Sequence, residues 1–110
     1  MKTQEFCIVL SSCPNGEVAD TIARELIKRG LAACVNILPS VRSVYTWKGK
    51  VETASEHLLL VKSHGRQYKA IETCVRQLHP YELPEIIAVP IAGGLDTYLS
   101  WLEKPEATHE

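Results

Sequence analysis

The sequence predicts an α+β domain in which four strands form one sheet and two helices cover one of its faces. Short apolar segments alternate with two segments of helical periodicity, in the order strand–helix–strand–strand–helix–strand. The chain of 110 residues suits a single domain over 1–110, with residues 103–110 as a polar tail. Strand–helix–strand connections are right-handed, which places both helices on the same side. The simplest arrangement is the ferredoxin-like sandwich.

The first strand and the first helix are marked by a change from a continuous to a periodic apolar pattern. Residues 5–10 are an apolar run that ends at the turn-forming segment 11–16. Asn15 is a suitable N-cap, and apolar residues then recur at intervals of four along residues 18–27. Gly30 is expected to end this helix, because glycine readily adopts the left-handed conformation that follows a helix.

A long β-hairpin is predicted in the middle of the chain. Residues 31–38 form a short apolar strand and, after an interruption at Pro39, residues 41–47 alternate as in a half-buried strand. Gly49 tolerates positive φ and is expected to close a tight turn. The return strand occupies residues 50–61 and includes a polar stretch. The polar outer half of this hairpin is expected to project beyond the core.

The last third of the chain supplies a second helix, a last strand and a short final helix. Helical spacing returns at residues 67–78, and Pro80 stops that helix. Residues 85–91 predict a strand, in which Pro90 favours an edge position. Residues 95–102 predict the final helix. Because both main helices cover one face, the other sheet face and the hairpin remain uncovered, which predicts self-association.

Composition and charge exclude several classes of function. The net charge is −1 and the basic residues are scattered, so the chain lacks the basic face that nucleic-acid binding requires. No apolar stretch reaches the roughly 20 residues that cross a bilayer, so we expect no membrane insertion. The first residues lack the apolar core of a signal peptide, which favours a cytoplasmic location. The four cysteines form no C-x-x-C pair, so we expect free thiols and no structural zinc site.

Five short motifs resemble those of the CutA family, and they occur in order over residues 6–102. The motifs are Ser12–Asn15, Leu31–Asn36, Val44–Lys50, His79–Glu85 and Tyr98–Leu102. The resemblance implies a ferredoxin-like subunit that assembles as a homotrimer in the cytoplasm. It also implies a role in the tolerance of divalent metal cations, copper among them, and we expect this role to involve metal binding without catalysis.

The resemblance further implies a metal site made of a cysteine, a histidine and a glutamate. The last two correspond to His79 and Glu85, whereas the cysteine position corresponds to Ser11. Cys13 lies two residues later, on the same side of an extended chain, and is the candidate replacement. Thiolate, imidazole and carboxylate together suit copper or zinc. The helix that follows Cys13 is expected to lower the pKa of its thiol.

These residues also have structural interpretations. His79 can cap the carboxyl end of the second helix, and Glu85 can be a solvated charge at the start of a strand. The turn at Pro14 opposes the alternation that would align Cys13 with the Ser11 position.

The aromatic residues allow either a ligand pocket or a subunit interface, and we favour the interface. They are Tyr45, Trp47, Tyr81 and Trp101. Two other functions remain open. One is a regulatory module that binds a small anionic ligand in clefts between subunits, with the turn Cys13–Gly16 holding the anion at a helix start. The other is a structural scaffold for a membrane-attached partner.

Overall fold

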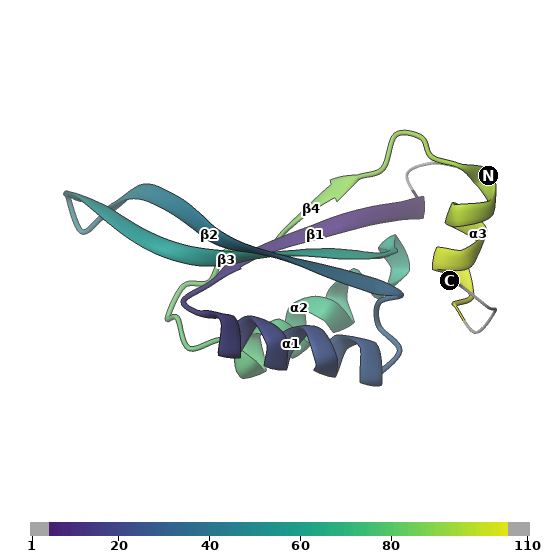
Figure 1. Ribbon diagram of the computed structural model, residues 1–110, viewed down its shortest axis with the longest axis horizontal. Coiled ribbons are helices and arrows are strands. Elements are labelled where there is room, and N and C mark those ends of the chain that lie inside the picture. The colour runs from purple at the N-terminus through teal and green to yellow at the C-terminus, as the bar shows by residue number, and fades with distance from the viewer. Residues whose placement is uncertain (1–4, 106–110) are drawn as a thin grey trace.

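The computed structural model describes residues 5–105, and its topology confirms the predicted fold class. The elements in chain order are β1 (Phe6–Cys13), α1 (Gly16–Lys28), β2 (Cys34–Trp47), β3 (Lys50–His64), the 3₁₀ helix η2 (Gly65–Gln67), α2 (Tyr68–Leu78), β4 (Ile87–Pro90) and α3 (Asp96–Glu103). The strands form one antiparallel sheet in the order β2-β3-β1-β4. Figure 1 shows α1 and α2 together on one face of this sheet.

The first helix has the two end signals that the sequence predicted. Asn15 accepts a hydrogen bond at its side-chain oxygen from the Val18 backbone N–H at 2.8 Å, which satisfies one of the free N–H groups of the first turn. Gly30 follows the helix with φ of 71°, a conformation in which a side chain would be strained. The expected helix boundaries are therefore confirmed at both ends.

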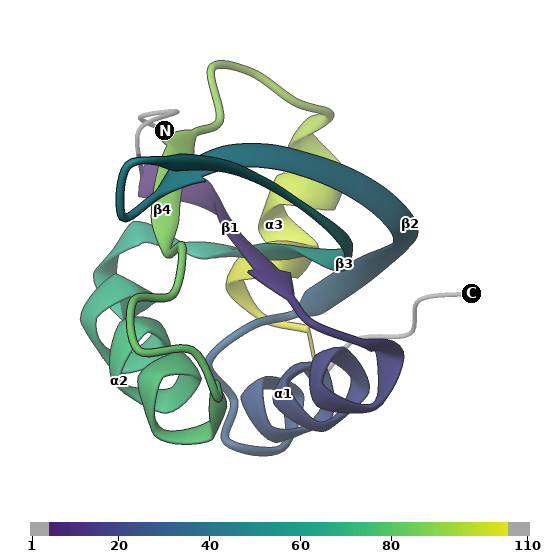
Figure 2. The same cartoon turned by 90° about the vertical axis from the view of Figure 1, so that its left-hand side faces the viewer.

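The main core lies between the sheet and the two long helices, which are neighbours on its face (Figure 2). Its fully buried aliphatic side chains come from β1, β3 and both helices, and are Val9, Leu59, Val61, Ile22, Leu26, Ile71 and Val75. Cys7, Cys13 and Cys74 belong to the same cluster, as small apolar residues would. This burial anchors the sheet and leaves the hairpin to extend from it.

Strands β2 and β3 pair from one end of the sheet to the hairpin tip, which extends past both helices (Figure 1). The predicted interruption is a bulge within one strand, because the register shifts between Leu38 and Val41 and pairing then resumes. Ser40, which lies within this bulge, has a positive φ of 60°. At the tip, Lys48 and Gly49 have φ of 52° and 80°, the left-handed pair of values that a tight hairpin turn requires.

Each strand differs in at least one boundary from the sequence expectation. β2 begins at Cys34 and not at residue 31, and β3 ends at His64 and not at residue 61. β1 continues to Cys13, because residues 11–13 pair with residues 57–59 of β3. The expected turn therefore begins later. β4 is shorter than expected, and pairs only with residues 7–10 of β1 at the edge of the sheet. The longer β1 decides which side chains reach the functional site.

The short helix α3 lies at the end of the sheet opposite the hairpin tip (Figure 1). Its residues Leu99 and Leu102 pack with Phe6 in a second, smaller apolar cluster. Glu103 still belongs to this helix, whereas residues 106–110 of the expected polar tail lie outside the described residues. Within residues 5–105, no helix is both long and apolar enough to cross a membrane.

Candidate functional site

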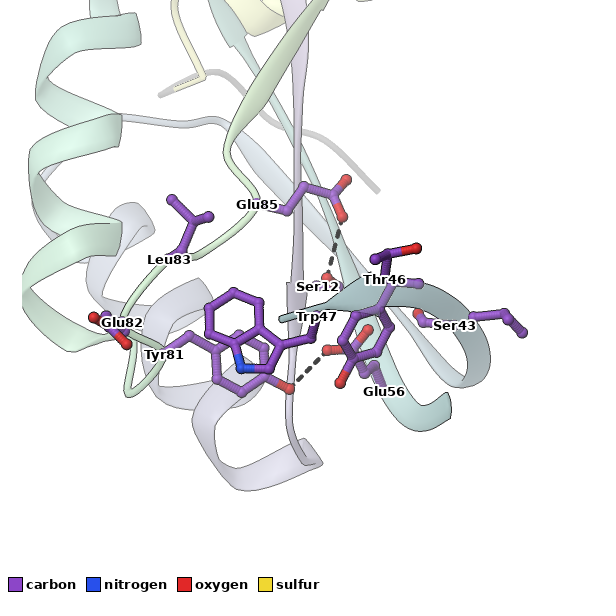
Figure 3. Close-up of a pocket in the computed structure, with 11 residues that line it drawn as sticks. Ser12, Ser43, Thr46, Trp47, Glu56, Tyr81, Glu82, Leu83 and Glu85 are labelled. Atoms are coloured by element: carbon purple, nitrogen blue, oxygen red, sulfur yellow. Dashed lines mark hydrogen bonds between the residues drawn. The ribbon is translucent and has the colours of Figure 1, made fainter. Parts of the chain in front are cut away.

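A pocket of about 620 Å³ lies against the hairpin, with a lining that reaches from Glu56 to Trp47 beside the tip (Figure 3). Three parts of the chain line it, namely the end of β1, both hairpin strands and the segment after α2. The lining residues are Ser12, Ser43, Val44, Tyr45, Thr46, Trp47, Glu56, Tyr81, Glu82, Leu83 and Glu85. Because side chains alternate along a strand, Ser12 and Glu56 face the pocket while Ser11, Cys13 and His57 face the helices.

His79 holds the end of β1 to the segment that follows α2. Its Nε2–H donates a hydrogen bond to the Ser12 carbonyl oxygen at 2.8 Å, and its Nδ1 accepts one from the Tyr81 backbone N–H at 3.2 Å. Because a carbonyl oxygen can only accept, the ring proton lies on Nε2 and the ring is neutral. His79 also caps α2 as expected, because its backbone N–H donates a hydrogen bond to the Val75 carbonyl oxygen at 2.8 Å. The side chain meanwhile binds β1.

Tyr81 connects the same segment to the hairpin. Its hydroxyl donates a hydrogen bond of 2.7 Å to Oε2 of Glu56, drawn in Figure 3. Glu56 is only 5% exposed, so this carboxylate lies deep in the pocket wall. Burial, and then the hydrogen bond to Glu56, raise the pKa of the Tyr81 hydroxyl, which therefore stays protonated and remains a donor at neutral pH.

Ser12 makes the third connection. Its hydroxyl donates a hydrogen bond to Oε1 of Glu85 at 3.1 Å (Figure 3). Glu85 is exposed and precedes β4, as the solvated charge expected at a strand start would, and it also lines the pocket. Ser12 consequently binds the segment after α2 twice, through its carbonyl oxygen to His79 and through its side chain to Glu85.

The structure does not bring together the three metal ligands expected from the sequence. Glu85 lines the pocket, whereas Cys13 is fully buried in the core on the helix side of the sheet. His79 uses both ring nitrogens in hydrogen bonds. Within residues 5–105, no group of three or more His, Cys, Asp or Glu side chains is placed to hold a metal ion. The donor set therefore does not fit a preformed three-ligand centre.

The reason lies in the regularity of β1. Ser11 and Cys13 do share one side, as the alternation argument predicted, but that side faces the core and not the pocket. The expected effect of the helix start on Cys13 is also reversed. Burial, and to a lesser extent the charge of Glu56, raise the pKa of the Cys13 thiol to about 11. Cys13 is therefore a neutral thiol at physiological pH.

This protonation state predicts a reactivity order for the cysteines. The thiolate is the reactive form, so Cys13, Cys7 and Cys74, all buried and with raised thiol pKa values, are expected to resist iodoacetamide at about pH 7.5. Cys34 is partly exposed and is expected to react first. Peptide mapping by mass spectrometry during labelling measures this order.

Labelling of Cys13 as fast as Cys34 would contradict the neutral thiol.

The raised pKa of the Cys13 thiol also affects how the stability of the fold depends on pH. The folded state holds the Cys13 proton more tightly than the unfolded chain, so stability from this group is complete at neutral pH. It is lost progressively as pH rises from about 8.5 towards about 11.

Three of the four aromatic residues that the sequence singled out line the pocket, namely Tyr45, Trp47 and Tyr81. Trp101 lies on α3, with its ring 5.8 Å from that of Tyr98. Tyr45 and Trp47 lie on the same hairpin face as Ser43. The alternating pattern of residues 41–47 predicted this shared face.

Sequence reasoning missed Ser12, Glu56 and Glu82. The available signal for Glu56 was its parity in β3, since it shares a face with Leu58 and Leu60 and not with core residue Leu59. Ser12 shows the same parity relative to Ser11 and Cys13 in β1. The Ser12 assignment depends on β1 continuing beyond residue 10, and the sequence does not reveal that continuation.

The charge of the pocket follows from its lining. Three carboxylates contribute to it, those of Glu56, Glu82 and Glu85, and none of the lining residues is basic. Negative charges in a concave site raise the local concentration of cations and repel anions. The pocket therefore combines an acidic floor with aromatic and hydroxyl-bearing walls, and it is suited to a cation.

The β-α-β-β-α-β sandwich with a long hairpin and a pocket against it defines a ferredoxin-like α+β protein. The family profile described as CutA1 divalent ion tolerance protein matches residues 7–105. The chain belongs to this family. "Divalent-cation tolerance protein CutA" of Thermus thermophilus is 47% identical over 97 residues, which are 88% of this chain and 94% of that relative.

Vertebrate relatives are longer than this chain. "Protein CutA homolog" of Xenopus laevis is 47% identical over 83% of this chain and 60% of its own length. "Protein CutA" of Homo sapiens is 44% identical over 84% of this chain and 52% of its own length. The chain thus spans little more than half the length of these relatives.

Solved structures agree in fold. The divalent cation tolerance protein Cut A1 of Thermus thermophilus superposes with a TM-score of 0.88 at 46% identity, covering 90% of this chain and 96% of that one. A protein from Archaeoglobus fulgidus, described as the periplasmic divalent cation tolerance protein CutA, gives a TM-score of 0.86 at 36% identity. It covers 88% of this chain and 94% of its own.

Proposed function

We propose that this protein contributes to tolerance of divalent cations, copper among them, by binding the ion reversibly in the cytoplasm without catalysing a reaction. The observation that carries this proposal is the pocket in which Glu56, Glu82 and Glu85 meet no basic side chain. Such a site accumulates cations electrostatically. The name of the Thermus thermophilus relative supports the link between this family and divalent cations.

The mode of binding follows from the spacing of donors. Since no group of three ligands is assembled within residues 5–105, the ion is held by one or two carboxylates while water completes its coordination shell. Glu85 is the main ligand in this proposal, because its carboxylate receives only the Ser12 hydroxyl within the pocket. His79 and Cys13 then support the wall and the floor behind it.

Neutralising Glu85 is expected to weaken copper binding. Glu85→Gln keeps an oxygen acceptor for the Ser12 hydroxyl and removes one charge, so the affinity for Cu²⁺ should fall roughly tenfold, as about 1.4 kcal/mol of lost interaction implies. Calorimetric titration of tag-free protein against Cu²⁺ measures the change. Glu17→Gln, an equal charge change at an exposed position on α1, is the matched control.

A different result would reassign the ligand. If Glu85→Gln binds copper like the parent protein, the carboxylate assignment is wrong. If His79→Ala remains folded and loses one equivalent of tightly bound copper, the imidazole ligand expected from the sequence is correct, and the ring must leave its hydrogen bonds on binding.

We also propose that the subunits assemble as a homotrimer, as the family resemblance implies. Several large apolar side chains of the hairpin and the edge strand face solvent in the single chain. Val51 and Val44 are 76% and 63% exposed, and Ile87 and Val89 of β4 are also exposed. Edge strands with apolar side chains favour pairing with another chain. Neighbouring subunits would cover these surfaces.

An anionic effector is less well supported. The pocket at the subunit's hairpin is lined by carboxylates and by no basic residue, so it repels phosphate or carboxylate ligands. A regulatory role for this pocket would require a cationic effector.

A further inference from the structure

We propose that the pocket binds a small organic ammonium compound, with the cationic nitrogen beside Glu56 and the carbon skeleton against Tyr45, Trp47 and Tyr81. This inference goes beyond the proposed binding of divalent metal ions and does not depend on it. The ligand class follows from three properties of the pocket, which are an uncompensated buried charge, aromatic walls and a volume much larger than a metal ion needs.

The buried charge belongs to Glu56. Its side chain is almost fully enclosed and accepts one hydrogen bond, from the Tyr81 hydroxyl to Oε2. Among the ion pairs of residues 5–105, none involves Glu56, and no lining residue is basic. A buried carboxylate is costly unless a cation compensates its charge. This pocket provides the carboxylate and leaves the cation to a ligand.

The aromatic walls distinguish an ammonium group from a metal ion. The face of an aromatic ring attracts an ammonium cation and its attached carbons, an arrangement used widely to recognise organic ammonium ligands. The ring of Trp47 already receives one such group, since Nζ of Lys48 lies 5.8 Å from its centroid. The contact shows that this ring is accessible to an ammonium group.

The volume and the spacing of the carboxylates support the same class of ligand. The pocket has about 620 Å³, within the range of about 300–1,000 Å³ typical of sites for small organic molecules. Glu56, Glu82 and Glu85 all line it, yet the three are not grouped closely enough to ligate one metal ion together. Carboxylates spaced in this way can surround an organic cation, whose charge and hydrogen-bond donors extend over several atoms.

The test uses two probes that share a skeleton and differ in charge. Benzylamine is a cation at neutral pH and benzyl alcohol is neutral. Each is titrated into ¹⁵N-labelled protein in the assembly that it forms in dilute buffer. The chain has two tryptophans, so two indole N–H signals report on ligand binding. Benzylammonium is expected to shift the signal of Trp47 in the pocket and not that of Trp101 on α3, and benzyl alcohol is expected to bind at least tenfold more weakly.

Two variants test the residues named. Glu56→Gln removes the charge and keeps an acceptor for the Tyr81 hydroxyl, and should weaken benzylammonium binding tenfold or more. Tyr45→Leu keeps an apolar side chain at a partly exposed position and removes the aromatic face, and should weaken it several-fold. Glu17→Gln on α1 should bind like the parent. The Trp101 signal and the melting curve show whether each variant is folded.

The outcomes separate this proposal from the metal proposal. Equal binding of the two probes, or unchanged binding by both Glu56→Gln and Tyr45→Leu, overturns the ammonium site. If Glu56→Gln does not fold, Tyr45→Leu decides. A parallel Cu²⁺ titration of the same samples judges the divalent-cation function independently, so either proposal can fail while the other stands.

Discussion

Replacing Val51 with glutamate is expected to dissociate the protein into smaller species, whereas the parent protein gives a mass near three times 12.3 kDa in light scattering. Val51 is 76% exposed in the single chain and lies on the same hairpin face as Val44, beyond the helices. In the proposed trimer a neighbouring subunit covers this face. A carboxylate there would be buried without a cation, at a cost of about 3 kcal/mol or more at each contact.

The matched control for this experiment is Thr21→Glu on the exposed side of α1, which adds the same charge outside the hairpin. It should leave the mass unchanged. Sedimentation velocity at micromolar concentration, with a circular dichroism spectrum of each sample, separates dissociation from unfolding. A parent protein that is monomeric in dilute buffer would refute the trimer. A Val51→Glu variant that sediments like the parent would show instead that the hairpin face is not a subunit contact.

A large loss of folding stability is expected for His79→Ala. The substitution leaves the Ser12 carbonyl and the Tyr81 N–H without their partner, and removes a buried ring that packs on Tyr81. Two lost hydrogen bonds at buried groups, together with the lost packing, should lower the free energy of unfolding by about 2–4 kcal/mol. Urea denaturation in the presence of a chelator measures this loss without any contribution from bound metal.

His57→Ala is the matched control, because it makes the same chemical change at a histidine whose Nδ1 has no hydrogen-bond partner among the described residues. It should destabilise the protein less than His79→Ala does. Equal losses would mean that the two hydrogen bonds of His79 add little. A stability difference that appears only when metal is added would favour a ligand role for His79 over the structural link.

The elements of the fold were predictable because each has a local cause. The apolar spacing and the Asn15 and Gly30 signals define α1, and Gly49 marks the hairpin turn. The sequence predicted an interruption at Pro39 and Ser40. In the structure this interruption is a bulge between Leu38 and Val41, inside one strand that pairs with β3 on both sides of it. Local patterns therefore identified the elements and misplaced some of their ends.

The candidate site was only partly predictable. Glu85 and three aromatic residues were singled out from the sequence and do line the pocket. Cys13 was expected at the site and is instead in the core, while its neighbour Ser12 takes the position facing Glu85. Neighbouring residues of an extended strand point to opposite faces, and the side that Ser11 and Cys13 share is the core side. Alternation alone does not say which of the two faces meets the pocket.

The sequence by itself determined the order of the elements, the one-sided packing of α1 and α2, the hairpin, and membership in the family through motifs spread along the chain. Only the tertiary structure decided that Glu56 of β3 meets Tyr81, 25 residues away, and that Ser12 meets Glu85, 73 residues away. Such pairs depend on strand register and on how the segment after α2 crosses the sheet. Both are set by packing between distant segments, which leaves no periodic trace in the sequence.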